Sequence, residues 1–300
     1  MQAMRTPDSR FESLPGYPYN PKYFETQGLR VHYVDEGSSD RVTYLCLHGE
    51  PTWSYLYRKM IPPLAQRGRV LAPDLVGFGK SDKPARVEDY SFRLHFDILV
   101  EFLKQTRATN VVLICQDWGG LLGLPLAMEL ESIFKGLVIM NTGIPDPTSV
   151  NWLEPKNILG GIGFMAWRTF AVTHPDLPIG QIVSAGSWPP LALNADVRRG
   201  YDAPFPDKSF KAGADAFPRL VPISADHPTL PYMQRARQRI EKSELPKLVL
   251  FSNRDPITWS QKDYFSRLKN VVADIQIQNA GHFLQEDKGE EIAEQIIRYF

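Results

Sequence analysis

The chain has 300 residues and a mass of 34.1 kDa, with 34 basic and 34 acidic side chains and a pI near 7.0. A chain of this size buries about 75% of the surface that its unfolded form exposes, so a large core is expected without a disulfide or metal. Nucleic acids and anionic membranes bind clustered Lys and Arg, and the sequence contains no such cluster, so we expect neither as a partner. A small, uncharged or mildly polar ligand fits better.

The cysteines and the N-terminal segment indicate the cellular compartment. Cys46 and Cys115 each lie in a short apolar run, which is typical of reduced thiols in a protein core. The first ten residues lack the apolar stretch of a secretory signal. No segment approaches the roughly 18 uninterrupted apolar residues of a membrane helix. The sequence therefore predicts a cytoplasmic protein.

Short β-rich runs alternate with helix-period stretches along the chain. The first run, 29–34, alternates polar and apolar residues as an antiparallel edge strand would, whereas the runs at 42–47 and 111–116 are almost continuously apolar. Apolar residues from 92 to 103 form one stripe of a helix. Further strands are predicted at 70–72, 137–140, 248–251 and 275–277, and a final helix ends at Phe300. This order predicts an α/β fold, with a mostly parallel sheet flanked by helices.

Residues 145–231 interrupt this alternation. They hold more than half of the 25 prolines and show no strand pattern, so we expect short helices and loops there. The sheet pattern resumes afterwards, which favours an insertion into one sheet. We expect a core of residues 1–145 and 223–300 and a helical cap of residues 146–222, placed over the strand ends where ligands bind. A small separate domain, remote from the site, is the alternative.

The most informative segment is 111–123, where a buried strand leads into Gln116, Asp117 and Trp118, then two glycines and a helix. This order resembles the strand-to-helix elbow of α/β-hydrolases, in which small residues let a strained turn project a nucleophile. A carboxylate, with an ordinary pKa of about 3.9, is already ionised at pH 7 and needs no base to activate it. Attack by Asp117 on a saturated carbon would displace a leaving group and form an alkyl ester. Alternatively, Asp117 only caps the following helix.

The segment from His48 to Trp53 follows directly after the strand at 42–47. A turn there can direct the backbone N–H of Glu50 toward the elbow. Together with the backbone N–H of Trp118, it would form an oxyanion hole for negative charge on the ester oxygen during attack by water. We expect His48 to fix the turn and not to titrate.

His282 lies between the predicted strand 275–277 and the last helix. It suits the base that activates water against the ester, because its ordinary pKa of about 6.5 leaves it mostly neutral at pH 7. Asp255 ends another strand and could orient His282; the chain order nucleophile, acid, histidine is that of α/β-hydrolases. The glycines between 77 and 81 predict a tight turn and not a phosphate loop. The remaining histidines are expected at ordinary polar positions: His32, His95, His174 and His227.

Four segments together resemble the haloalkane dehalogenases, over most of the chain. They are His-Gly-Glu-Pro-Thr-Trp-Ser-Tyr-Leu-Tyr-Arg at 48–58, Gly-Phe-Gly-Lys-Ser-Asp-Lys-Pro at 77–84, Gln-Asp-Trp-Gly-Gly at 116–120 and Ala-Gly-His-Phe-Leu-Gln-Glu at 280–286. The resemblance is strongest to the subfamily with an Asp-His-Asp triad and two halide-binding tryptophans. It implies an α/β-hydrolase fold, the nucleophile at Asp117, the base at His282, the acid at Asp255, and neither a metal nor an organic cofactor.

The resemblance also implies where the halide and the substrate bind. The indole N–H of Trp118 would donate to the departing halide. One subfamily supplies an Asn after His-Gly, but this chain has Glu50, which has no donor in its side chain when ionised. The second donor is therefore expected at Trp167, with the tryptophans at 152 and 188 as alternatives. Three residues are expected to line the apolar pocket by the same resemblance: Phe164, Phe205 and Pro206.

The function implied is hydrolysis of a small haloalkane by water to a primary alcohol, halide and a proton, with detoxification as its role. An epoxide hydrolase is the nearest alternative, because it shares the Asp nucleophile and the His base. It needs an acid for the ring oxygen, for which Tyr201 and Tyr232 are the candidates. A non-catalytic ligand receptor on the same fold is a third possibility, and a Ser esterase is disfavoured because the elbow has no Ser.

Overall fold

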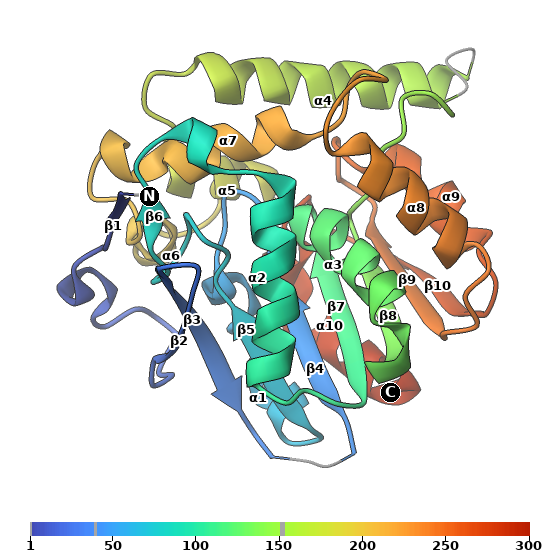
Figure 1. Cartoon of the computed structure of the whole chain (residues 1–300), viewed down its shortest axis with the longest axis horizontal. Helices are drawn as coiled ribbons and strands as arrows, with labels where there is room; N and C mark the ends of the chain where they lie inside the picture. The colour runs from blue at the N-terminus through green and yellow to red at the C-terminus, as the bar shows by residue number, and fades with distance from the viewer. Residues whose placement is uncertain (1, 39–40, 151–153) are drawn as a thin grey trace.

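The computed structural model describes residues 2–38, 41–150 and 154–300. Within these residues the chain forms an eight-stranded sheet in the order β10-β9-β8-β7-β4-β5-β3-β2 (Figure 1). The strands are β2 (Lys22–Thr26), β3 (Leu29–Glu36), β4 (Thr43–Leu47), β5 (Arg69–Pro73), β7 (Val111–Gln116), β8 (Phe134–Met140), β9 (Lys247–Ser252) and β10 (Val271–Ile277). A small second sheet pairs β1 (Ala3–Met4) with β6 (Lys83–Pro84).

The sheet is parallel from β5 to β10, and β2 and β3 are antiparallel at one end. The sequence predicted β3 as an antiparallel edge strand. Its direction is confirmed, but β2 pairs along it and is itself the edge. β2 was not predicted, because its Lys, Glu and Thr side chains leave too short an apolar pattern.

Helices cover both faces of the sheet, as predicted. One layer consists of α2 (Phe92–Gln105), α3 (Trp118–Glu129) and α8 (Leu230–Ile240), which contact one another. In Figure 1, α2 and α3 lie in front of the sheet and α10 (Leu284–Tyr299) lies behind it. α10 contacts α1 (Ile61–Ala65), and α9 (Lys262–Ser266) packs against β9. α2 begins at Ser91, whose hydroxyl accepts the N–H of Leu94 at 3.1 Å.

Between β8 and α8, the described residues form four α-helices over the carboxyl ends of the central strands (Figure 1). They are α4 (Pro155–Thr173), α5 (Ile179–Gly186), α6 (Ala195–Asp202) and α7 (Ala212–Leu220). The prediction of short helices was wrong for α4, which has 19 residues. The one proline of α4, Pro155, lies in the first turn, where its missing N–H needs no partner, so it starts the helix and does not break it.

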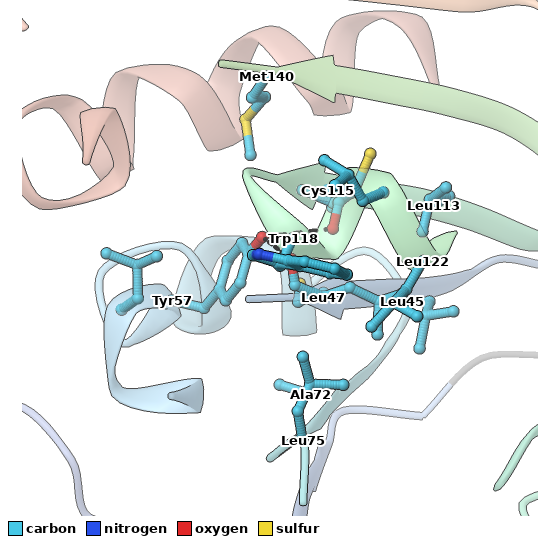
Figure 2. Close-up of a cluster of buried hydrophobic side chains, with 14 of the residues drawn as sticks. Leu45, Leu47, Tyr57, Ala72, Leu75, Leu113, Cys115, Trp118, Leu122 and Met140 are labelled. Atoms are coloured by element: carbon cyan, nitrogen blue, oxygen red, sulfur yellow. Dashed lines mark hydrogen bonds between the residues drawn. The ribbon is translucent and has the colours of Figure 1, made fainter. Parts of the chain in front are cut away.

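The core is continuous and apolar at the centre of the sheet. Figure 2 shows Trp118 among apolar side chains of β4, β7 and α3. Cys46 and Cys115 are buried and unpaired, as predicted, and burial raises the pKa of both thiols. Among the described residues, no helix has the length and apolar character that crossing a membrane requires.

Candidate active site

Asp117 stands at a sharp turn between β7 and α3. Its φ of +51° lies in the left-handed region, which a non-glycine residue adopts only when its surroundings hold it there. Its N–H donates to Asn141 O at 3.0 Å, and its carbonyl accepts the Thr142 hydroxyl at 2.7 Å. A Cβ at position 119 would overlap Leu47 O, so this turn needs glycine. The elbow predicted from the sequence is therefore present.

The Asp117 side chain does not cap α3, so the helix-cap alternative is wrong. Its Oδ1 accepts the backbone N–H of Glu50 at 2.8 Å, and its Oδ2 lies 3.6 Å from His282 Nε2. A Cβ on Gly49 would overlap this carboxylate, which explains the glycine before Glu50. The side chain lies in the cavity between the loop after β4 and the loop before α10.

His282 connects two carboxylates. Its Nδ1 lies 3.0 Å from Asp255 Oδ1, on the side opposite to Asp117. The Gln116 amide nitrogen lies 3.0 Å from His282 Nε2 and 3.2 Å from the His282 carbonyl oxygen. An amide N–H donated to Nε2 requires the proton on Nδ1, where Asp255 accepts it. This tautomer is the neutral form of His282, which exists once the proton has left Nε2, and its Nε2 lone pair lies on the side of Asp117.

Asp255 is buried and saturated with donors. Its Oδ1 accepts the N–H of Ile257 at 2.8 Å and its Oδ2 accepts the N–H of Thr258 at 3.1 Å, together with the Thr258 hydroxyl. Burial opposes ionisation, but His282 and these donors outweigh it and hold the pKa of Asp255 below its ordinary value. Asp255 is therefore a fixed negative charge beside the imidazole.

The two carboxylates also control the charge of His282. Burial alone would lower its pKa, yet Asp255 and Asp117 outweigh burial and raise the pKa to about 10. With both carboxylates ionised, His282 carries a proton at pH 7. The expectation of a mostly neutral His282 is therefore wrong for this state of the site, because an unperturbed pKa ignores the paired charges.

Glu50 is buried beside the Asp117 carboxylate. Its side chain is buried, and Oε1 has no hydrogen-bond partner among the described residues. Burial and the Asp117 carboxylate raise the pKa of Glu50 well above its ordinary value, which favours the neutral form of its side chain. Its backbone N–H points at the elbow, as predicted. His48 fixes the turn as predicted: its Nε2 accepts the Leu75 N–H at 2.8 Å.

Two of the four other histidines are not at ordinary polar positions. His32 is buried and its Nδ1 lies 2.7 Å from Asp74 Oδ2. The same Asp74 carboxylate accepts the N–H of Lys80 at 2.8 Å and so holds the tight turn predicted at 77–81, where Gly77 and Gly79 have positive φ. His95 is buried, and neither ring nitrogen has a partner among the described residues.

Two functional neighbours were missed by the sequence analysis. Gln116 precedes the elbow and contacts both His282 Nε2 and its carbonyl oxygen. Asn141 follows β8; its amide nitrogen donates to the carbonyls of Gly281 and His282 at 3.0 Å each, and its Oδ1 accepts the Ser252 N–H at 2.9 Å. Gln116 ends a buried strand and Asn141 directly follows one, so their polar character at strand ends marks both, but their contacts with His282 come only from the fold.

A cavity of about 1080 Å³ lies between these strand ends and the insertion. Asp117, His282 and Trp118 line one end of it, and Phe164 and Trp167 of α4 line it from the opposite wall. Among the described residues, neither Trp118 nor Trp167 donates its indole N–H to a protein acceptor, whereas the buried Trp53 donates to Gly200 O at 3.0 Å. Two tryptophans whose indole N–H groups have no acceptor in the described part of the chain thus line one cavity.

The other pocket predictions were partly wrong. Phe205 does not line the cavity but packs edge-on against Phe78, with ring centroids 6.4 Å apart, and Pro206 is exposed. Both follow α6, which packs against the core beside the N-terminal segment, as the hydrogen bond from Thr6 to Pro204 O shows. Trp188 does not line the cavity either, and Trp152 lies outside the described residues.

The two tyrosines that could act as the acid of an epoxide hydrolase both lie away from the cavity. Tyr201 is buried, and its hydroxyl donates to Glu286 Oε2 at 2.6 Å, within a cluster that includes Arg58. Tyr232 packs against Phe92, with ring centroids 4.6 Å apart. Neither tyrosine lines the cavity. Within the described residues there is also no group of three or more His, Cys, Asp and Glu that could hold a metal ion.

Comparison with known proteins gives the class and then the family. Residues 45–289 match the family model described as the alpha/beta hydrolase fold, so the chain is an α/β-hydrolase-fold protein. It is 44% identical to a haloalkane dehalogenase of Mycolicibacterium paratuberculosis, covering 100% of this chain and 98% of the relative. It is 41% identical to one of Psychrobacter cryohalolentis, with the same coverage. The chain therefore belongs to the haloalkane dehalogenase family.

A solved structure supports the same assignment. The chain is similar to the tetrameric haloalkane dehalogenase DpaA from Paraglaciecola agarilytica, with a TM-score of 0.90 and 38% identity. The similarity covers 100% of this chain and 99% of that one, so it includes the insertion as well as the sheet.

Proposed function

We propose that this chain hydrolyses carbon–halogen bonds of small haloalkanes, with Asp117 as the nucleophile, His282 as the base and Asp255 as its charged partner. The observation that carries the proposal is a strained elbow whose Asp117 carboxylate does not cap α3 and lies beside His282 at a cavity. Trp118 and Trp167 line the same cavity, and their indole N–H groups have no acceptor among the residues that the structure describes. The chain's membership of the haloalkane dehalogenase family supports the same activity.

The first step is attack by Asp117 Oδ2 on the carbon that bears the halogen. Oδ1 is held by the N–H of Glu50, so Oδ2 is free to form the bond. The carbon–halogen bond breaks, and the halide leaves with its electron pair. Negative charge in an apolar cavity is costly unless donors already point at it, and the indoles of Trp118 and Trp167 supply such donors without a full positive charge.

The second step is hydrolysis of the ester by water. Alkylation converts the Asp117 carboxylate into a neutral ester, which removes one of the two charges that raise the pKa of His282. His282 then releases its proton to solvent and becomes a base. Neutral His282 takes a proton from water, and the hydroxide attacks the ester carbonyl carbon. The products are alcohol, halide and one proton, and Asp117 and protonated His282 are regenerated.

Asp255 and Glu50 support the second step in different ways. Asp255 stabilises the imidazolium that forms when water is deprotonated. The backbone N–H of Glu50 lies against Oδ1, the atom that carries negative charge when water attacks. The backbone N–H of Trp118 begins α3 at the same point and is the proposed second donor.

The proposed division of the chain follows from these contacts. Residues 146–222 form the cap, since α4 to α7 lie within this range and α4 supplies cavity wall. Residues 1–145 and 223–300 form the core, since α8 packs against α3. A cytoplasmic location and a role in detoxification stay predictions.

The test is a parallel assay of bromide release from 1,2-dibromoethane and of ring opening of styrene oxide. We expect multiple turnovers of the bromide and none of the epoxide, because neither Tyr201 nor Tyr232 lines the cavity. Turnover of styrene oxide alone would favour the epoxide hydrolase. Binding of haloalkane without any bromide release would favour a non-catalytic receptor.

A further inference from the structure

A second carboxylate lies beside the loop that carries His282. Both oxygens of Asp287 accept the backbone N–H of Trp188 at 2.9 Å, and Oδ2 also accepts the backbone N–H of Gly281 at 2.8 Å. Trp188 belongs to the insertion, just after α5, and Gly281 directly precedes His282. One side chain thus connects the insertion with the His282 loop.

The backbone around this contact leaves little room for adjustment. A Cβ on Gly281 would overlap the carbonyl oxygen of Gly186, and the N–H of Phe283 donates to that same oxygen at 3.3 Å. α10 leaves helical geometry at Lys288, directly after Asp287, with φ −136° and ψ 32°. The first turn of α10, which follows His282, is therefore offset from the rest of the helix and is held through Asp287.

From this geometry we propose that Asp287 is a positioning residue for His282: its ionised carboxylate holds Gly281 and Trp188 together and so keeps the imidazole at the Asp117 ester during hydrolysis. The inference rests on the proposed function, because it assigns Asp287 to the step in which His282 acts as the base. Asp287 itself does not line the cavity and touches no reacting atom.

The position of this carboxylate makes its charge sensitive to pH. Burial raises the pKa of Asp287 to about 6, against the three hydrogen bonds that it accepts. The charged groups around it are Glu286 on α10, Lys59 from the segment before α1, His282, and Arg254, whose guanidinium stacks on the Trp188 ring at 4.7 Å. Protonation of Asp287 below pH 6 removes the negative charge that both N–H groups face and weakens the contact.

The experiment is rapid-quench kinetics of Asp287→Asn with a bromoalkane that the wild type turns over. The Asn side chain keeps the size but removes the charge. Alkylation does not need His282 as a base, so the burst of one bromide per site keeps its rate constant within about twofold. Ester hydrolysis slows about tenfold, so steady-state turnover falls and the ester accumulates. Glu290→Gln, an exposed change on the same helix, is the matched control and keeps both rates.

The pH dependence separates positioning from a merely structural role. The ratio of wild-type to Asp287→Asn hydrolysis rate constants rises as pH increases from 5 to 8, with a midpoint near 6. Loss of the Asp287 charge also changes the field at His282, so the pKa of His282 is measured in both proteins by NMR and the ratio is corrected for its titration. A ratio that does not change with pH, or a burst amplitude that falls in proportion to steady-state turnover, would overturn the proposal. Absence of bromide release from the wild type would instead refute the proposed function.

A second measurement needs no variant. In the wild type, the backbone amide resonances of Gly281 and Trp188 should shift together with a common midpoint near pH 6. Amide resonances that stay unchanged between pH 5 and 8 would also overturn the proposal, whether or not Asp287→Asn folds.

Discussion

The carboxyl edge of the sheet and the insertion above it hold their functional side chains by different forces. At the sheet edge, Asp117, Asp255 and His282 are fixed by short hydrogen bonds that come from the ends of neighbouring strands. In the insertion, Phe164 and Trp167 face the cavity through apolar packing of α4. The same helix exposes Leu159 and Ile162 to solvent. Directional bonds fix the chemistry, and non-directional packing fixes the shape of the pocket.

This difference predicts that substitution of the triad at the sheet edge abolishes turnover. Substitution of residues in the insertion should lower the rate of turnover without abolishing it. The largest effect is expected for Asp117→Asn, which keeps the elbow but removes the charged nucleophile. Bromide release should fall by about 10⁴-fold or more, with unchanged near-UV circular dichroism. Mass spectrometry must first exclude deamidation back to Asp. Undiminished bromide release from the intact Asp117→Asn protein would contradict the assigned nucleophile.

An intermediate loss of activity is expected when either proposed halide donor is removed alone, Trp118 at the sheet edge or Trp167 in the insertion. Trp118→Phe and Trp167→Phe each delete one indole N–H and keep an aromatic ring. We expect the rate of the bromide burst to fall by about 10²-fold in each case, as for the loss of one preorganised donor. Trp188→Phe, which changes a tryptophan outside the cavity, is the control. A Trp167→Phe protein with a wild-type burst would assign the second donor to another residue.

The smallest effect is expected on stability, at the contact between α2 of the core and α7 of the insertion. His95 of α2 packs edge-on against Phe217 of α7, with centroids 4.7 Å apart, and Phe217 packs on Trp118 at the same distance. Burial lowers the pKa of His95 to about 3. Because this pKa lies below the unfolded value of about 6.5, the unfolded state binds the proton more tightly. The contribution of His95 to stability is therefore complete above pH 6.5 and is lost as pH falls toward 3.

His95→Leu removes this proton linkage. The variant should gain about 2 kcal/mol relative to the wild type between pH 8 and pH 5, measured from denaturant midpoints at each pH. His174→Leu, at a partly exposed position, is the control and should gain much less. An equal difference in the free energy of unfolding between His95→Leu and the wild type at both pH values would contradict the lowered pKa of His95.

Sequence reasoning located the sheet edge well because its signals are local. A buried strand followed by Asp117 and two glycines, and the loops at His48 and His282, each lie within a few residues of a strand end. The charges of the site were harder to predict. The pKa of His282 depends on Asp255 and Asp117, and that of Glu50 on burial and Asp117, and the fold brings these groups together from distant segments. Gln116 and Asn141 act through contacts with His282 that no local pattern specifies.

The insertion was predicted less well because its arrangement depends on long-range packing. Prolines correctly indicated a region without strands, but the 19-residue α4 was not expected. Phe205 and Trp167 are both aromatic residues in the same proline-rich segment, and only the packing of α4 and α6 decides which of them faces the cavity.

The most direct test of the account is mass spectrometry of His282→Phe after exposure to a bromoalkane. Without the base, the ester on Asp117 should form but not hydrolyse. The peptide containing Asp117 should gain the mass of the alkyl group with loss of one hydrogen, in near-stoichiometric amount, while one bromide is released per site. A wild type that turns over and a His282→Phe protein that releases bromide repeatedly without any adduct on that peptide would contradict the covalent mechanism.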